Sequence, residues 1–270
     1  MIRLTRGGPL HLGVNYRLSY GWDFLPGPLD VSYPERAARL DADFALLARH
    51  GATLLRWFVW NDGRRIVLRD GIRTPDFAPL RAGLDAARRH GLSVLLVLLD
   101  HTFCFHEEPA GNGVKQGHGA WLKDEARFDR LLAELLEPTI VTAGAHPAVM
   151  GFELINEPEM AMRRRDRWFR RPSGAGCSLV PEDCQLTLAE MHRRMRRCAA
   201  LVHRHTATQF SVGSMSSRWL AQWEDCLDPA ADFLTFHYYG QHDERDLDRV
   251  FTTRIAPLAA RLPVGLGEFY

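Results

Sequence analysis

An α/β fold is predicted for this chain of 270 residues by three observations. Apolar runs of strand length alternate with stretches in which apolar residues recur at three- and four-residue steps, as in helices that cover a parallel sheet. The helix exits repeat, because "ARHGATLL" and "RRHGLSVLL" both place His-Gly between a helix and a strand, where glycine suits a left-handed cap. A hydrophobic content of 46% is enough for one large core, so we expect a single domain over 1–270.

Seven strands and three amphipathic helices can be placed from these patterns. Each strand is a short apolar run, and each helix carries one apolar stripe that would pack on the sheet. We expect strands at 11–16, 52–59, 92–99, 148–155, 208–213, 232–237 and 263–268. The helical stripes are Leu40/Phe44/Leu47, Phe77/Leu80/Leu84/Ala87 and Leu188/Met191/Met195/Cys198/Val202.

Seven such units favour a (β/α)8 TIM barrel over a doubly wound sheet. No glycine-rich phosphate turn follows the first strand, and "GNGVKQGHG" (111–119) does not have the glycine spacing of a dinucleotide fingerprint. In a barrel, the reacting groups lie at the C-terminal ends of the strands. The chain ends at Tyr270, directly after the seventh expected strand, so we expect a barrel that lacks its eighth β/α unit and has two unpaired edges.

Charge and motif content exclude several classes of function. The 34 Lys and Arg residues almost cancel the 33 Asp and Glu residues, so global charge predicts neither a nucleic-acid nor a membrane partner. The N-terminus has no apolar stretch of signal-peptide length, and no apolar run could cross a bilayer, so we expect a cytoplasmic protein. The motifs C-x-x-C, H-E-x-x-H and G-x-S-x-G are all absent, and the oligomeric state stays open.

The ends of the expected strands are unusually polar. An arginine inside an apolar strand, as in "LLRWFVW", is costly unless a carboxylate or a ligand pairs with it. Two glutamates that converge from the fourth and seventh strands would supply this pairing. The polar residues are Arg56 in the second strand, Asp100-His101 after the third, Asn156-Glu157 after the fourth, His237-Tyr238-Tyr239 after the sixth and Glu268 after the seventh.

Two glutamates across a sugar-sized gap are the minimum apparatus of glycoside hydrolysis. One carboxyl group protonates the departing oxygen, and the other attacks the anomeric carbon or activates water, so the two need different pKa values. Arg56 would keep Glu268 ionised, whereas Glu157, farther from the cation and partly desolvated, could hold a proton. Asn156 would then hydrogen-bond a sugar hydroxyl beside the reacting carbon.

The segment "HPAVMGFELINEPE" (146–159) resembles the acid/base strand of clan A glycoside hydrolases, closest to the family 5 cellulases and mannanases. "GVNY", Arg56, His101, "FHYY" (236–239) and "GLGEF" (265–269) are similar to the other positions of this family, in the same order and over nearly the whole chain. The resemblance implies retention of configuration on β-linked gluco- or manno-oligosaccharides, without metal or organic cofactor. It also implies Glu157 as acid/base, Glu268 as nucleophile, Asn156 as the 2-hydroxyl contact, and Arg56, His101, His237 and Tyr239 as supporting residues.

The chain departs from the family pattern at its end, where the eighth strand and its sugar-stacking tryptophan are missing. A truncated chain, an open barrel sealed by a partner and a catalytically silent carbohydrate-binding barrel all explain this. Trp22 and Trp60 follow the first two strands and could either stack on substrate or pack in the core. The arginine-rich loop 163–171 is either a solvated segment or a clamp for an acidic glycan.

Overall fold

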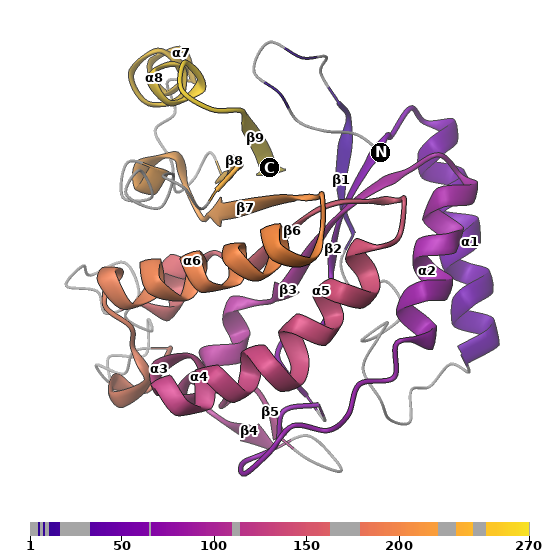
Figure 1. Cartoon of the computed structure of the whole chain (residues 1–270). Coiled ribbons are helices and arrows are strands. Elements are labelled where there is room, and N and C mark those ends of the chain that lie inside the picture. The colour runs from indigo at the N-terminus through magenta and orange to yellow at the C-terminus, as the bar shows by residue number, and fades with distance from the viewer. Residues whose placement is uncertain are drawn as a thin grey trace.

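The computed structural model describes residues 5, 8, 11–16, 33–64, 66–109, 114–162, 179–220, 231–239 and 247–269. At its centre is a seven-stranded sheet in which every neighbouring pair is parallel (Figure 1). All seven predicted strands are present, with ends that differ from the prediction by two residues or fewer. In sheet order they are β1 (Gly13–Tyr16), β2 (Leu54–Phe58), β3 (Ser93–Leu99), β6 (Val149–Asn156), β7 (Gln209–Ser214), β8 (Phe233–Tyr238) and β9 (Val264–Phe269).

Helices cover the outside of the sheet. In Figure 1, α1 and α2 lie together on one side, α5 and α6 run along another, and α7 and α8 lie beside β9. Gly51 and Gly91, which follow α1 and α2, have φ values of +87° and +71°, as the repeated His-Gly exits predicted. The helices are α1 (Tyr33–Arg49), α2 (Ala78–Arg89), α3 (Gly119–Lys123), α4 (Glu125–Leu131), α5 (Glu137–Gly144), α6 (Leu188–His205), α7 (Leu247–Val250) and α8 (Ala256–Ala259).

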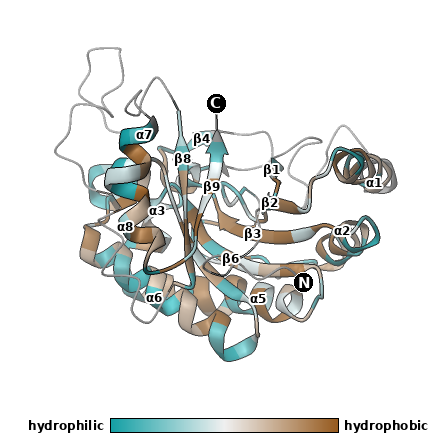
Figure 2. Ribbon diagram, turned by 90° about the horizontal axis from the view of Figure 1, so that it is seen from above, coloured by the Kyte–Doolittle hydropathy of each residue, from teal (hydrophilic) through white to brown (hydrophobic). Residues whose placement is uncertain are grey.

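The core lies between the sheet and these helices. Every residue of β3 and β6 is buried, which fits their near-continuous apolar sequences. Helix α6 begins at a capping box formed by Thr187 and Glu190, and buries its predicted apolar stripe. Figure 2 shows the same division, because β3 is hydrophobic along most of its length while the outer helices carry hydrophilic residues.

The sheet is a nearly closed barrel from which one unit is missing. Strands β1 and β9 are its edges, and within the described residues no backbone pairing joins them. A side chain bridges this seam, because Asn15 Nδ2 in β1 donates a hydrogen bond of 2.8 Å to Glu268 Oε1 in β9. The predicted barrel without an eighth β/α unit is therefore confirmed for the described part of the chain.

Some features of the fold were not predicted. A short antiparallel hairpin joins β4 (Glu108–Pro109) to β5 (Val114–Lys115), and a π-helical segment, Leu132–Leu136, separates α4 from α5. None of the helices that the structure describes is long and apolar enough to cross a membrane. Trp22 and the arginine-rich loop 163–171 lie outside the described residues.

Candidate active site

The polar residues predicted at the strand ends come together at the C-terminal end of the sheet. Arg56 lies at the centre of the group and is 4% exposed. Its Nη1 contacts Asn15 Oδ1 at 3.2 Å and Glu268 Oε1 at 3.3 Å. Burial would lower the pKa of Arg56, but the charges of Glu153, Glu268 and Glu157 outweigh it and raise that pKa, so the guanidinium stays charged.

The main partner of Arg56 is Glu153, which was not predicted as a site residue. Glu153 is fully buried in the middle of β6, and its Oε2 accepts from Arg56 Nε at 3.0 Å and from Nη2 at 2.6 Å. Its Oε1 accepts from the Thr235 hydroxyl at 2.8 Å. The sequence did contain a signal, because "GFELI" places a glutamate in an apolar run just as "LLRWF" places an arginine.

An irregularity in β6 brings Asn156 to the same guanidinium. Residues 153 and 156 are an odd number of positions apart and would point to opposite faces of a regular strand. The β6–β7 register shifts between Glu153 and Asn156, and as a result Asn156 Oδ1 also accepts from Arg56 Nη2, at 2.9 Å. Asn156 Nδ2 then faces Asp100 Oδ2 at 3.1 Å and His101 Nδ1 at 3.2 Å, which fixes the orientation of the amide.

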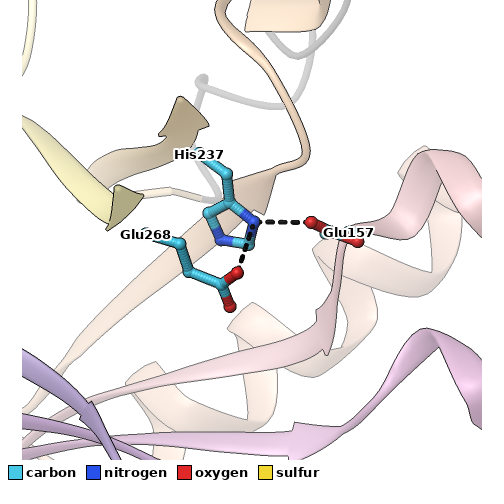
Figure 3. A group of neighbouring side chains, drawn as sticks. All are labelled: Glu157, His237 and Glu268. Atoms are coloured by element: carbon cyan, nitrogen blue, oxygen red, sulfur yellow. Dashed lines mark hydrogen bonds and ion pairs between the residues drawn. The ribbon is translucent and has the colours of Figure 1, made fainter. Parts of the chain in front are cut away.

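Glu157 follows β6 with its backbone in the left-handed region, at φ 48° and ψ 60°. This conformation is strained for a residue with a side chain, and it turns the chain from the strand into the 3-10 helix Pro158–Ala161. Both carboxylate oxygens contact histidines. Oε1 lies 2.7 Å from His237 Nδ1 (Figure 3), and Oε2 lies 3.2 Å from Nδ1 of His101, which the figure does not draw.

Glu268 lies opposite, near the end of β9. Besides Asn15 and Arg56, it receives a hydrogen bond at Oε2 from the Tyr239 hydroxyl. The β8–β9 register shifts just before Glu268, and a Cβ added at Gly267 would lie 3.0 Å from the His237 ring. A glycine at this position therefore lets the His237 ring pack against β9, next to the carboxylate.

His237 joins the two glutamates, as Figure 3 shows. Its Nδ1 lies 2.7 Å from Glu157 and 3.5 Å from Glu268, while its buried Nε2 has no hydrogen-bond partner among the described residues. Burial, and then the positive charge of Arg56, lower the pKa of His237 to about 4. The ring is therefore neutral at pH 7 and does not compensate the charge of either carboxylate.

Tyr238 and Tyr239 point to opposite sides, as neighbouring residues of a strand do. Tyr238 belongs to the apolar core, whereas Tyr239 reaches Glu268 and lies edge-on to His237. The structure thus brings together all of the predicted polar residues, namely Glu157, Glu268, Asn156, Arg56, His101, His237 and Tyr239. It adds Asn15 and Glu153, and it gives a contact with Asn156 to Asp100, which had been noted after the third strand without a role.

Trp60 does not belong to this group. Its side chain is fully buried, its Nε1 donates to Thr139 Oγ1 in α5 at 2.9 Å, and its ring packs edge-on against Phe77. Strand β2 ends at Phe58, so the alternation that would have aimed Trp60 inward no longer applies. The predicted sugar contact of Trp60 is wrong, and the alternative that the side chain packs in the core is confirmed.

Three atoms of the site also form a possible metal-ligand set. Glu157, His237 and Glu268 each offer one ligand atom, and these atoms lie within 4.8 Å of one another. Carboxylate and imidazole groups suit Zn²⁺. The same groups are engaged with protein partners, since Glu157 is hydrogen-bonded to His237, and Glu268 to Tyr239 and Arg56. The arrangement can therefore hold and move protons with the chain's own side chains.

Comparison with solved structures identifies proteins of the same fold. A β-1,4-mannanase from the common sea hare Aplysia kurodai matches with a TM-score of 0.69 at 18% identity, over 97% of this chain and 80% of the mannanase. A β-mannanase from the blue mussel Mytilus edulis matches at 0.64 and 18%, over 88% and 74% of the two chains. GH5_18 from Streptomyces cattleya, in complex with GlcNAc, matches at 0.59 and 16%, over 86% and 51%.

These structural neighbours agree with the resemblance found in the sequence, because they are mannanases and a family 5 protein. At such low identities the likeness shows the fold. Comparison by sequence found no match, either to a protein-family model or to a curated protein.

Proposed function

We propose that this chain is a retaining β-glycoside hydrolase, with Glu157 as acid/base and Glu268 as nucleophile. The observation that carries the proposal is a pair of glutamates on different strand ends, with one oxygen of each within 4.8 Å of the other. Retaining enzymes hold their two carboxyl groups about 5 Å apart, whereas inverting enzymes leave a gap of about 6.5–9.5 Å for a water molecule.

The surroundings of the two carboxylates support these separate roles. Glu268 lies beside the Arg56 guanidinium and accepts hydrogen bonds from Asn15 and Tyr239, so three donors surround its carboxyl group. Glu157 contacts two imidazole rings, of which His237 is neutral at pH 7, so a proton on Glu157 is opposed by less positive charge. A nucleophile needs the first environment and a general acid the second.

The proposed reaction has two steps. Glu268 attacks the anomeric carbon to form a glycosyl ester, while Glu157 donates its proton to the departing oxygen. Glu157 then removes a proton from water, which attacks the same carbon and frees Glu268, so the configuration is retained. We assign to Asn156, whose amide is fixed by Arg56 and Asp100, a hydrogen bond to the hydroxyl beside the reacting carbon.

The proposed substrates are β-linked gluco- or manno-oligosaccharides, and the names of the structural neighbours favour manno sugars. Residues 1–270 would act as one catalytic barrel domain, and the cytoplasmic location expected from the N-terminus stays a prediction. Neither a metal nor an organic cofactor enters the proposed steps.

The test is intact mass spectrometry after incubation with activated 2-deoxy-2-fluoro β-mannosides and β-glucosides. The fluorine slows the second step, so a working nucleophile accumulates a glycosyl adduct. We expect an adduct on the unmutated chain and none on Glu268→Gln, which keeps the shape but lacks the charge. Glycan binding without an adduct from any sugar would overturn the proposal in favour of a silent carbohydrate-binding barrel.

A further inference from the structure

We propose that Glu153 is a positioning residue, which holds Arg56 in the orientation that serves Glu268. The inference rests on the proposed function, because it assigns a role within the same reaction. Glu153 does not face the substrate side of the pair of glutamates. It lies in the middle of β6, is fully buried, and acts through the guanidinium.

The contacts of Arg56 divide its guanidinium into two edges. Nε and Nη2 donate to the same oxygen of Glu153, at 3.0 and 2.6 Å. Nη1 projects from the other edge and contacts Glu268 at 3.3 Å. Because the guanidinium is planar and rigid, anchoring one edge fixes the direction of the other.

Glu153 is itself held on its second oxygen. Thr235 in β8 donates to Oε1 at 2.8 Å, so the carboxylate is tied to β2 through Arg56 and to β8 through Thr235. A buried ion pair contributes little to stability compared with well-packed apolar residues. Its link to Glu268 through Arg56 is better explained by the orientation and charge balance that Glu153 gives to Arg56.

The sheet leaves room for this pair at one glycine. A Cβ added at Gly213 in β7 would lie 2.8 Å from Glu153 Oε2 and 3.1 Å from Arg56 Nη2. Gly213 is not among the residues with positive φ, so its backbone tolerates a side chain. The alanine substitution would therefore push the ion pair apart without removing any group that takes part in it.

Three variants separate the charge of Glu153 from its geometry. Glu153→Gln keeps the shape, because the amide oxygen can accept from Arg56 while the amide nitrogen donates to the Thr235 hydroxyl. Glu153→Asp keeps the charge but shortens the side chain by one methylene group. Gly213→Ala keeps every group and displaces the pair.

For Glu153→Gln we expect kcat to fall about 10- to 100-fold at nearly unchanged KM. Without the charge of Glu153, the charge of Arg56 acts on Glu268 uncompensated, which moves the acidic limb of the kcat/KM profile to lower pH. For Glu153→Asp and Gly213→Ala we expect a loss of about 100-fold in kcat, because a misplacement of about 1 Å is enough for that.

Glu125→Gln is the control for removing a carboxylate from a buried arginine, although Glu125 itself is exposed, unlike Glu153. Glu125 pairs with Arg194, another buried arginine (1% exposed), but this pair joins α4 to α6 outside the site. The control should lower the melting temperature and leave the pH profile of kcat/KM unchanged. If Glu153→Gln behaves in the same way, with only its melting temperature altered, the positioning role is wrong.

Crystal structures of Glu153→Asp and Gly213→Ala make the test independent of turnover. We expect Arg56 Nη1 to move out of contact with Glu268 in both. If Nη1 keeps its place in both variants, Glu153 does not position it, whatever the kinetics show. If the unmutated chain hydrolyses nothing, the proposed function fails, while these structures still decide whether Glu153 orients Arg56.

Discussion

The ends of β6 and β9 each carry a glutamate, but they place it in different surroundings. At β9, Glu268 meets a guanidinium, an amide and a phenol hydroxyl, all of which stabilise a carboxylate. At β6, Glu157 meets two imidazole rings, and its backbone is strained. Both residues are glutamates, so the groups around each one would decide which carboxyl group donates a proton and which one attacks the anomeric carbon.

The largest effect should come from Glu268→Ala. With the nucleophile removed, we expect kcat/KM to fall by about 10⁴-fold or more on both oligosaccharides and activated aryl glycosides. Steady-state rates on both kinds of substrate would measure this, with added azide as a control. Azide can replace the missing carboxylate as nucleophile on an aryl glycoside. A small loss, or a loss confined to oligosaccharides, would reverse the roles proposed for the two glutamates.

Glu157→Ala should show a loss that depends on the leaving group. We expect about 10³-fold on oligosaccharides, whose leaving oxygen must be protonated, and about 10-fold or less on activated aryl glycosides, which need little protonation. The ratio of the two losses is the measurement. Equal losses on both substrates would contradict the assignment of Glu157 as acid/base.

The smallest expected effect is on the pH dependence of the free energy of unfolding. It comes from His118, a buried histidine outside the site, and can be compared with His237 inside it. Burial lowers the pKa of His118, which is 6% exposed, from 6.5 to about 4. Since the unfolded chain binds this proton more readily, the free energy of unfolding should fall as the pH drops from about 6.5 towards 4. Between pH 7 and pH 5 the decrease would be about 2 kcal/mol for one such histidine.

Urea unfolding at pH 7 and pH 5 would measure this effect, with His118→Gln as the variant. The variant should lose about 2 kcal/mol less than the unmutated chain over that interval. A similar loss in both would mean that the acid sensitivity comes from elsewhere, and His237, with the same direction of shift, would be the next residue to test.

Much of the fold could be predicted because strand and helix periodicities are local properties of the sequence. The seven strands and the stripes of α1, α2 and α6 followed from apolar spacing alone. The hairpin of β4 and β5 and the π-helical segment after α4 follow no such local rule. They depend on contacts that form only in the folded chain.

Apart from Arg56, the predicted site residues lie at or just after a strand end, which is where the reacting groups of a barrel are found. Glu153 gives the same signal as Arg56, a charged residue inside an apolar strand, but its pairing with Arg56 joins two distant segments and is visible only in the folded chain. Gly213 and Gly267 were missed for a related reason, since their importance lies in the space they leave for Arg56, Glu153 and His237. Trp60 was considered for the site because it follows the second strand, and that position alone does not tell a buried side chain from an exposed one.

The left-handed backbone of Glu157 has a consequence for how this chain can change over generations. A glycine there would relieve strain of about 1 kcal/mol and would remove the proposed proton donor in the same step. Selection for thermal stability alone would therefore favour loss of this carboxyl group. A lineage that keeps glutamate at this position would then be one in which selection acts on catalytic turnover rather than on stability.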